Sequence, residues 1–484
     1  MPSVRRCQGR THLNPHFTLQ NDQTELPPIP RAGYARIDDV EMSRGRHYAR
    51  VSFDLVDADW LDNCLASDHK NIEENPLDFE KMPLFHLEVV LKLSAHGQPF
   101  RFPSKSSRPY QAPKLRSLMV EDSQPDWWGR YPYDWKESVF DSSMWFFIEQ
   151  TKKWKGHRAD IYRNMSDDAK SINVEIQRFT SKKLDQIFTL PGTVVNKLGA
   201  SEQALLNDVT CDRVIIFDVG QGNANGMVRD ASDAPELYFD VGAGVYRNQR
   251  TRPSTIHLPA HNVKAVILSH WDGDHWAGAN IPGNDALLSK TWIAPNQVVG
   301  PRHVVFAHRI IKNKGKLLLL AGMSPQIHTA PIQGGRVLQL TQGTGHDRND
   351  GGLVASVEIT APANQRRSIL LTGDCDYCHF SHLITAPVIG LVAPHHGAAL
   401  KSNHTHMPSR ANNQSKLAYS FGPNNAHGKF HVRHPTAEGV ALHNAWHHGS
   451  WRPTRPGFGN PGPYVVATSD HTPGGARGDV YLDW

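Results

Sequence analysis

The sequence predicts an α/β fold, and three features of the chain after residue 210 support this class. Short runs rich in β-branched residues recur, as expected of buried strands. Each run ends in a small polar cluster, which is typical of loops that carry functional side chains. A helical stretch at His303–Lys312 lies between the runs, so that strands alternate with helices. The six runs are Arg213–Phe217, Glu236–Phe239, Val263–Leu268, Ser368–Leu371, Val388–Val392 and Lys416–Ser420.

The length of the chain predicts more than one domain. Its 484 residues are about three times the size of a usual domain, and a hydrophobic content of 39% supports a large core. The composition changes near residues 200–210. We therefore expect an additional N-terminal α+β domain at residues 1–205 and a domain that carries the chemistry at residues 206–484.

The N-terminal domain carries no cluster of candidate ligands. Val51–Val56 and Leu87–Leu93 are predicted strands, and Asp141–Lys155 is a predicted helix. Residues 156–200 are expected to form charged helix and then a turn at Pro191–Gly192. A tryptophan-rich stretch could stack on nucleobases, but a core or a docking surface is the more usual role. We therefore expect this domain to bind a protein partner, to mediate self-association or to regulate the enzyme. The tryptophans are Trp127, Trp128, Trp135, Trp145 and Trp154.

Several classes of protein are excluded by composition. No apolar run approaches the roughly 18 residues that a membrane-spanning helix needs, so we expect no contact with a membrane. The arginines at positions 5, 6 and 10 are followed by no apolar segment, which argues against a secretory signal. Five cysteines in 484 residues are too sparse for a disulfide framework and are typical of the reducing cytoplasm, where we expect the protein to act.

Histidine and positive charge are concentrated in the C-terminal half. Of the 28 histidines, 21 fall in residues 251–484. The same residues hold 20 Lys and Arg against 12 Asp and Glu. This balance suggests metal chemistry on an anionic substrate, and an uneven surface charge is the alternative.

The main chemical signal is His270-x-Asp272-x-Asp274-His275. Four metal-competent side chains within six residues would repel one another or lack partners without a cation. His270 and Asp272 can bind one ion, and Asp274 and His275 can bind a second where the chain turns at Gly273.

These residues resemble the HxDxDH form of the metallo-β-lactamase motif, with Asp272 where many relatives have His. Asp218–Ala224 (DVGQGNA), Leu370–Asp374 (LLTGD) and Pro394–Gly397 (PHHG) extend the likeness. Together they resemble the soluble hydrolase domain of the DNA-uptake competence protein (ComEC-type), over roughly residues 211–450. The resemblance implies a four-layer αββα metallo-β-lactamase fold for the C-terminal domain.

The resemblance also assigns roles to single residues. It implies two divalent ions, Zn²⁺ or Mn²⁺, with Asp374 bridging them, and it implies no organic cofactor. The late histidine ligand is His395 or His396, and we favour His395. The catalytic candidates are Asp274, which orients a hydroxide, His396, which contacts a substrate oxygen or protonates a leaving group, and His434, which contacts substrate. The metal ligands are expected to be His270, Asp272, Asp274, His275, Asn349, Asp374 and His395.

The expected function is that of a dinuclear metal-dependent hydrolase, a phosphodiesterase or nuclease that uses a metal-bridging hydroxide. Nucleic acid is the leading substrate class. The alternatives are a small phosphodiester, an ester or a lactone, or a partner-gated effector subunit of a larger complex. Cys375-x-x-Cys378 could be half of a zinc site or a redox pair, but two buried or partly exposed thiols are the simpler interpretation.

Overall fold

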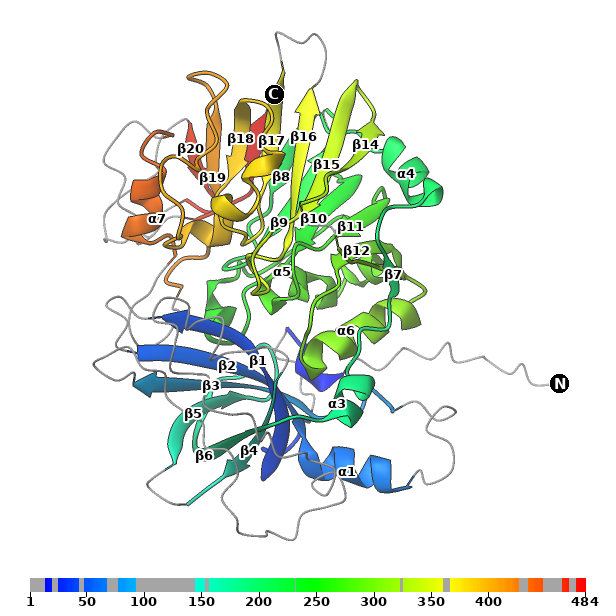
Figure 1. The fold of residues 1–484 in the computed structure, drawn as a ribbon, viewed down its shortest axis with the longest axis vertical. Helices are drawn as coiled ribbons and strands as arrows, with labels where there is room; N and C mark the ends of the chain where they lie inside the picture. Colours follow the sequence, from blue (N-terminus) through cyan, green and yellow to red (C-terminus); the bar gives the residue numbers. More distant parts are fainter. Residues whose placement is uncertain are drawn as a thin grey trace, which may run out of the picture.

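The structure of the chain is a computed structural model with two parts, a barrel formed early in the sequence and a pair of sheets formed later (Figure 1). No helix among the described residues is long and apolar enough to span a membrane. The structure describes residues 14–19, 25–42, 48–67, 77–92, 144–152, 156–230, 232–322, 325–359, 366–425, 434–446, 464–469 and 476–484.

The N-terminal part is a closed barrel with the strand order β1-β2-β3-β5-β6-β4. Its interior is filled by aliphatic and aromatic side chains such as Phe53, Phe85 and Phe146, which are fully or almost fully buried. The predicted strand at 51–56 falls within β2, and the one at 87–93 coincides with β3 up to Lys92. The elements are β1 (Ala32–Met42), β2 (Tyr48–Asp57), α1 (Ala58–Ser67), β3 (Leu84–Lys92), β4 (Trp145–Gln150), β5 (His157–Tyr162) and β6 (Lys170–Phe179).

The helix predicted at Asp141–Lys155 is wrong, because Trp145–Gln150 forms strand β4. This strand pairs with β1 on one side and β6 on the other, which closes the barrel and satisfies its backbone. The charged helix expected after residue 156 is wrong as well. In Lys170–Phe179, Ile172, Val174 and Ile176 alternate with polar residues and point into the barrel, a period-two pattern that suits a strand. Trp127, Trp128, Trp135 and Trp154 lie outside the described residues.

The C-terminal part contains two mixed sheets that pack face to face through one apolar core. The larger sheet has the order β21-β8-β9-β10-β11-β12-β13-β7, and the smaller has the order β14-β15-β16-β17-β18-β19-β20. The strands of the larger sheet are β7 (Thr193–Val195), β8 (Arg213–Ile216), β9 (Ala224–Val228), β10 (Leu237–Val241), β11 (Ala265–Ile267), β12 (Thr291–Pro295), β13 (Lys316–Leu320) and β21 (Val480–Asp483). Those of the smaller sheet are β14 (His328–Ile332), β15 (Arg336–Gln342), β16 (Leu353–Ile359), β17 (Arg367–Leu371), β18 (Val388–Val392), β19 (Lys416–Tyr419) and β20 (Val465–Ala467).

Helices cover the outer faces of the sheets. Helix α6 (Pro301–Lys312) confirms the predicted helix and packs Phe306 against Trp292 of the larger sheet. Val440 of α7 (Ala437–Leu442) joins the apolar cluster on the outer face of the smaller sheet. The remaining α-helices are α3 (Lys182–Ile187), α4 (Ala200–Asn207) and α5 (Gly273–Trp276), and the 3₁₀ turns are Pro15–Phe17, Tyr246–Thr251, Ala277–Asn280, Asp285–Ser289, Tyr377–His379, Ser381–Leu383 and Pro394–Gly397.

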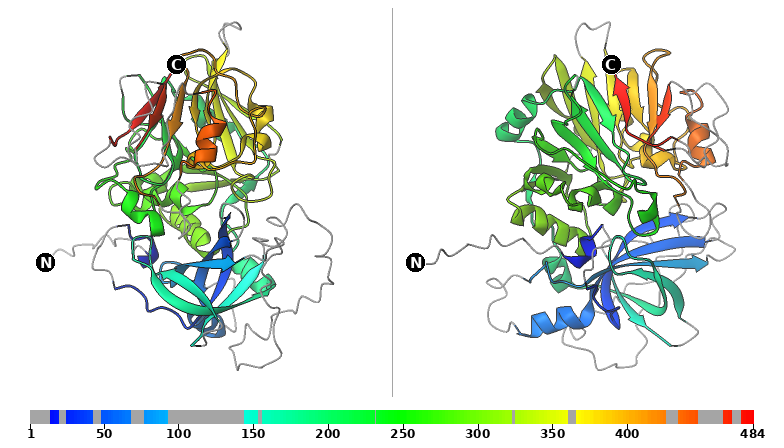
Figure 2. Two further views of the ribbon diagram at one scale, coloured as in Figure 1. Left: turned by 90° about the vertical axis from the view of Figure 1, so that its left-hand side faces the viewer. Right: turned by 180° about the vertical axis from the view of Figure 1, so that it is seen from behind.

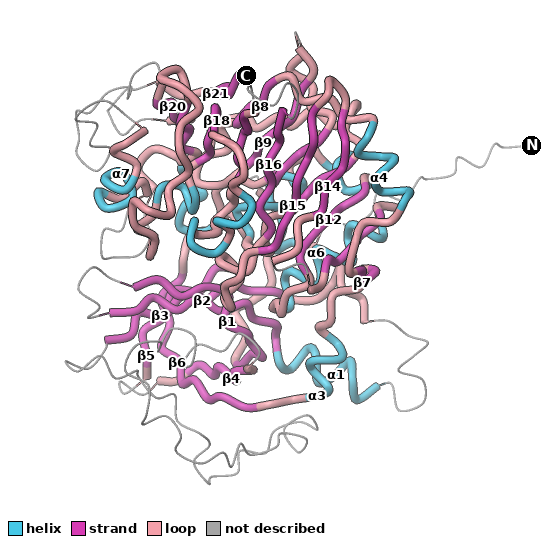
Figure 3. Tube along the Cα trace, turned by 45° about the horizontal axis from the view of Figure 1, so that its top comes forward, coloured by secondary structure: helices cyan, strands magenta, loops and turns pink. Residues whose placement is uncertain are grey.

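The two parts are joined by more than a linker. Strand β7, which precedes residue 205, pairs in parallel with β13 and so belongs to the larger sheet. The barrel packs against one end of the double sheet, as the side view and the view from behind show (Figure 2). Strands β1–β3 face the loops at that end (Figure 3). There Arg36 of β1 donates a hydrogen bond to the carbonyl of Val299 at 2.9 Å, and Asp54 of β2 accepts one from the backbone N–H of Arg302 at 2.8 Å.

Asp54 is completely buried where the barrel meets the start of α6. Burial raises the pKa of Asp54 to about 7, because the favourable Arg302 contacts do not compensate for desolvation and for the neighbouring Asp38. The native state therefore holds a proton on Asp54 that the unfolded chain releases near pH 4. The contribution of Asp54 to the free energy of unfolding is therefore fully present below the pKa of the unfolded chain. It is lost as the pH rises from about 4 to about 7.

We predict that Asp54→Asn removes this pH dependence. The amide keeps an acceptor for the Arg302 N–H and carries no charge, so the variant should match wild type near pH 5. Near pH 8 it should exceed wild type by about 1 kcal/mol or more, since one pKa unit corresponds to about 1.4 kcal/mol. Thermal unfolding at both pH values measures the difference, with the exposed Asp168→Asn as control. A variant that is destabilised equally at both pH values would contradict the assignment.

Candidate metal centre

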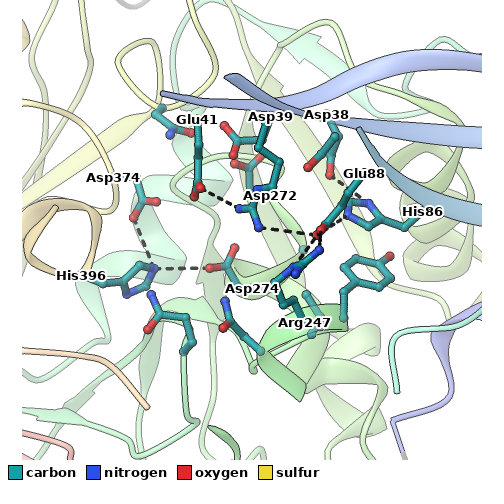
Figure 4. Close-up of a pocket in the computed structure, with 18 of the residues that line it drawn as sticks. Asp38, Asp39, Glu41, His86, Glu88, Arg247, Asp272, Asp274, Asp374 and His396 are labelled. Carbon is teal, nitrogen blue, oxygen red and sulfur yellow. Dashed lines mark hydrogen bonds and ion pairs between the residues drawn. The ribbon is translucent and has the colours of Figure 1, made fainter. Parts of the chain in front are cut away.

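The predicted ligand residues lie on loops that follow strands at the barrel end of the sheets. His270–His275 follows β11 and enters α5, and Asp374 follows β17. His395 and His396 follow β18, which is parallel to β17. Since the carboxyl ends of parallel strands meet at one edge of a sheet, Asp374 and the histidine pair arrive together (Figure 4).

Two groups of side chains have metal-ligand geometry. His270, His275 and Asp374 form one group, and Asp274, His275 and His396 form the other; within each group the donor atoms lie within 4.8 Å of one another. His275 Nε2 is 3.1 Å from Asp374 Oδ1, and His396 Nε2 is 3.4 Å from Asp274 Oδ2. The two groups share His275, and Asp374 of the first group also lies 3.8 Å from His396 of the second, so its predicted bridging role stays a prediction.

The donor atoms fit a divalent cation. Within the described part of the chain, the Nε2 atoms of His270, His275 and His396 and the Oδ1 atom of Asp374 are buried and take part in no hydrogen bond. Their contacts are with other charged groups of the cluster at 3.1–3.9 Å, and burying charged groups with imperfect partners is unfavourable. Imidazole nitrogen and carboxylate oxygen are ligands that Zn²⁺ accepts at this spacing. The residues present therefore suit a metal ion.

The electrostatic field of the buried carboxylates also favours binding of a cation. Burial alone would lower the pKa of His275, but Asp374, Asp240 and Asp274 outweigh burial and raise that pKa well above its ordinary value. Burial alone would raise the pKa of Asp374, and the neighbouring histidines instead hold it well below the usual range. The carboxylates thus remain charged and attract positive charge into the space between them.

Asp240 orients one of the central histidines. It is fully buried and lies within β10, near its end, with φ of 63°, a conformation that non-glycine residues seldom adopt. One oxygen lies 2.8 Å from His275 Nδ1, and the other accepts a hydrogen bond from Ser269 N at 2.7 Å. This contact leaves Nε2 of His275 directed at the other donors. The sequence analysis marked the polar cluster after residue 239 but did not assign Asp240 a role.

The adjacent histidines take different positions. Both have left-handed backbones, with φ of 47° for His395 and 53° for His396, so the turn presents both rings to the site. His396 is buried, its Nδ1 lies 2.8 Å from the Ser420 carbonyl, and its Nε2 belongs to the second donor group. His395 is 26% exposed, and its Nε2 lies 3.6 Å from Asp374. His434 stacks on His395 with ring centroids 5.2 Å apart.

Asp272 and Asn349 complete the set of predicted ligands. Asp272 Oδ2 is 3.4 Å from His270 Nε2, and its Oδ1 is 2.8 Å from the guanidinium of Arg348. Burial opposes ionisation of Asp272, but Arg348 and His270 prevail and lower its pKa to about 2. Asn349 lines the same cavity as Asp272 and Asp274. The sequence analysis did not identify Arg348, which directly precedes Asn349.

The cavity above these residues is roofed by the barrel. Strands β1–β3 contribute side chains opposite Asp272, Asp274, Asp374 and His396 (Figure 4). The roof residues are Asp38, Asp39, Glu41, Arg50, Ser52, His86 and Glu88. No sequence signal pointed to them, because each lies in an ordinary strand pattern.

Gln221, from the DVGQGNA segment, also lines the cavity. Its side chain is completely buried, and neither its Nε2 nor its Oε1 has a hydrogen-bond partner within the described residues. Its backbone is held in place, since Gln221 N donates to Thr251 Oγ1 at 2.8 Å. The neighbouring Asn223 N donates to the carbonyl of Asp274 at 3.1 Å, so this segment packs on the metal-ligand loop. Cys375 and Cys378, by contrast, are free thiols, the first buried and the second partly exposed.

Comparisons with known proteins give limited information. No protein-family profile and no curated protein matches the sequence. A solved metallo-β-lactamase, MIM-1 from Novosphingobium pentaromativorans, is similar with a TM-score of 0.23 and 12% identity, covering 39% of this chain and 78% of that chain. The functional argument therefore depends on the geometry of the site, and the resemblance to the competence hydrolase stays a prediction.

We predict that His396 binds a metal ion and that the adjacent His395 does not. His396→Ala removes a buried donor of the second group, so it should lose one divalent ion, while His395→Ala should keep the wild-type metal content. Metal analysis after equilibration with Mn²⁺ or Zn²⁺ measures this, and near-ultraviolet circular dichroism shows whether each variant is folded. Loss of an ion in His395→Ala with full occupancy in His396→Ala would instead support His395 as the ligand.

Proposed function

We propose that the protein is a metal-dependent hydrolase with a dinuclear centre, and that its C-terminal part is a four-layer αββα metallo-β-lactamase fold. The observation that carries the proposal is the pair of donor groups that share His275, with Asp374 of the first group 3.8 Å from His396 of the second. The packing of two sheets with helices on their outer faces supports the fold assignment.

The proposed ligands of the first ion are His270, Asp272 and Asp374, with Asn349 nearby. Those of the second are Asp274, His275, His396 and the shared Asp374. When bound, the two ions would polarise a substrate oxygen and lower the pKa of a water between them. Zn²⁺ and Mn²⁺ both suit a set of nitrogen and carboxylate donors.

The surrounding residues supply orientation and proton transfer. Asp274 has one oxygen near His396 and the other 3.9 Å from His275, so it can accept a proton or hold a nucleophilic water in place. His395, partly exposed and stacked on His434, can reach a leaving group at the cavity mouth and donate a proton to it. Asp240 keeps His275 in one orientation, so no reorganisation is needed during reaction.

The balance of charge in the cavity favours an anionic substrate only when cations are bound. Seven carboxylates and three arginines line it within the described residues, which gives an excess of negative charge. Such a cavity repels phosphate unless divalent ions compensate for the excess. Its volume of about 90 Å³ accommodates a single small group and is well below the roughly 300 Å³ of common ligand pockets. We therefore propose that one phosphodiester group enters, from a small molecule or from nucleic acid.

Nucleic acid remains the leading substrate within this proposal. The excess of positive charge in residues 251–484 supports it, because Lys and Arg outside the cavity can contact neighbouring phosphates. The small cavity favours a single strand over a rigid duplex at the reacting group. We also propose a cytoplasmic location and an N-terminal contact with a protein partner or a second copy.

Turnover of a defined substrate panel tests the proposed function. We expect hydrolysis of a simple phosphodiester and of single-stranded nucleic acid with Mn²⁺ or Zn²⁺, and loss of turnover in Asp274→Ala. Nucleic-acid binding should weaken steeply as salt rises. Turnover of esters or lactones alone would favour the alternative substrate class. A wild-type protein that binds no divalent ion at saturation would refute the proposal.

We predict that Gln221 contacts substrate oxygen through its side-chain amide. Gln221→Leu removes a buried amide that has no protein partner, so the apo protein should be as stable as wild type or more stable. The same change should raise the KM for a phosphodiester, or weaken binding of inorganic phosphate, by about tenfold. A tenfold change corresponds to about 1.4 kcal/mol, which is roughly the free energy of one hydrogen bond. Thermal unfolding and phosphate titration measure the two effects. A variant that loses stability and keeps phosphate affinity would show that the amide is structural.

A further inference from the structure

The barrel supplies a carboxylate that reaches the metal centre through one arginine. We infer that Asp38 of β1 is a positioning residue of the first metal position: it holds Arg348 so that Asp272 presents Oδ2 to the ion. This inference rests on the proposed function, because it concerns the same metal centre. It gives the N-terminal barrel a direct role in the active site.

The contacts form a continuous path. Arg348 Nη2 lies 2.8 Å from Asp38 Oδ1 and also 2.8 Å from Asp272 Oδ1. One guanidinium nitrogen therefore contacts a barrel carboxylate and a predicted metal ligand together. The other oxygen of Asp272, Oδ2, is 3.4 Å from His270 Nε2. The arginine thus fixes one oxygen of Asp272 and leaves the other facing the donor group.

Asp38 is itself held in place. Its Oδ2 accepts a hydrogen bond from Arg302 at 2.6 Å, and its Oδ1 lies 2.9 Å from His303 Nε2. The side chains of Arg302, Arg348 and Asp38 are all at least 92% buried. Buried ionic contacts are strongly directional, since water is not present to replace a lost partner. The barrel strand and the start of α6 therefore fix the position of Arg348 together.

Asp38 is important for binding of the first ion because it compensates for the positive charge of Arg348. A guanidinium beside a metal ligand competes with the metal for that carboxylate, and Asp38 compensates for its charge. Without Asp38, both Arg302 and Arg348 remain buried with one less counter-charge. Arg348 would then pair more fully with Asp272 and oppose a divalent cation at the first position. The second position lies around Asp274 and His396, which contact neither arginine among the ion pairs of the described residues.

Metal titration of Asp38→Asn tests the inference. We expect two Mn²⁺ ions in wild type, and in the variant we expect one ion with unchanged affinity and one with about 10–100-fold weaker affinity, the usual effect of losing a group that orients a ligand. Isothermal titration calorimetry and the electron paramagnetic resonance signal of coupled Mn²⁺ pairs measure this without substrate turnover. The control is Asp160→Asn, because Asp160 is a barrel carboxylate that contacts Arg247 at 3.2 Å and not Arg348.

A double-mutant cycle shows whether the effect passes through Arg348. Arg348→Met removes the competing charge, so adding Asp38→Asn to it should cost little further affinity. An equal loss in both backgrounds would overturn the inference. If Asp38→Asn does not fold, Asp38→Glu keeps the charge and displaces the carboxylate, and it should weaken the same single ion.

The outcomes separate the inference from the proposed function. Wild type and Asp38→Asn that bind two ions equally well would refute the role of Asp38 and leave the dinuclear centre intact. A wild-type protein that binds only the second ion would refute both the role of Asp38 and the dinuclear assignment. Failure of wild type to bind any ion would refute the proposed function itself.

Discussion

The arrangement of this molecule depends on a surplus of buried ionisable groups in one small volume. Four donor atoms from His270, His275, His396 and Asp374 are buried without hydrogen bonds among the described residues. A folded chain tolerates such a group only if something compensates for its desolvation, and a divalent cation does so with the fewest atoms. Folding and metal binding are therefore expected to be thermodynamically coupled in this protein.

The double sheet makes this concentration of donors possible. The loops that follow strands β11, β17 and β18 end at the same edge, so residues more than 100 positions apart meet without long insertions. Backbone strain contributes at the same edge, since Asp240, His395 and His396 have left-handed conformations. Rigid strands behind short, strained loops keep the candidate ligands in fixed positions, which is the arrangement that the proposed function needs.

The barrel closes the cavity of the candidate site. An open metal site on a double sheet could accept many substrates, but here strands β1–β3 close the cavity with charged side chains. Buried contacts between Asp38, Arg302 and Arg348 connect the two parts. Such contacts favour a fixed roof over a mobile one, because separation would leave several charges buried without partners. The barrel therefore limits both the size and the charge of the group that can react.

The sequence alone predicted which chemical groups come together more reliably than the architecture around them. The spacing of His270–His275 and the polar clusters after β-branched runs predicted candidate ligands that the structure brings together, because a short motif fixes which donor types are neighbours. The charge of residues 156–200 predicts helix, whereas the period-two pattern of Lys170–Phe179 matches the strand that the structure contains. Trp145–Gln150 is strand only because β1 and β6 pair with it. The choice between His395 and His396 depends on a left-handed turn that adjacent identical residues do not reveal. Only the tertiary structure decided that Asp38, Arg348 and Gln221 approach the metal ligands, since contacts between a barrel strand and a distant loop leave no periodic signal in the chain.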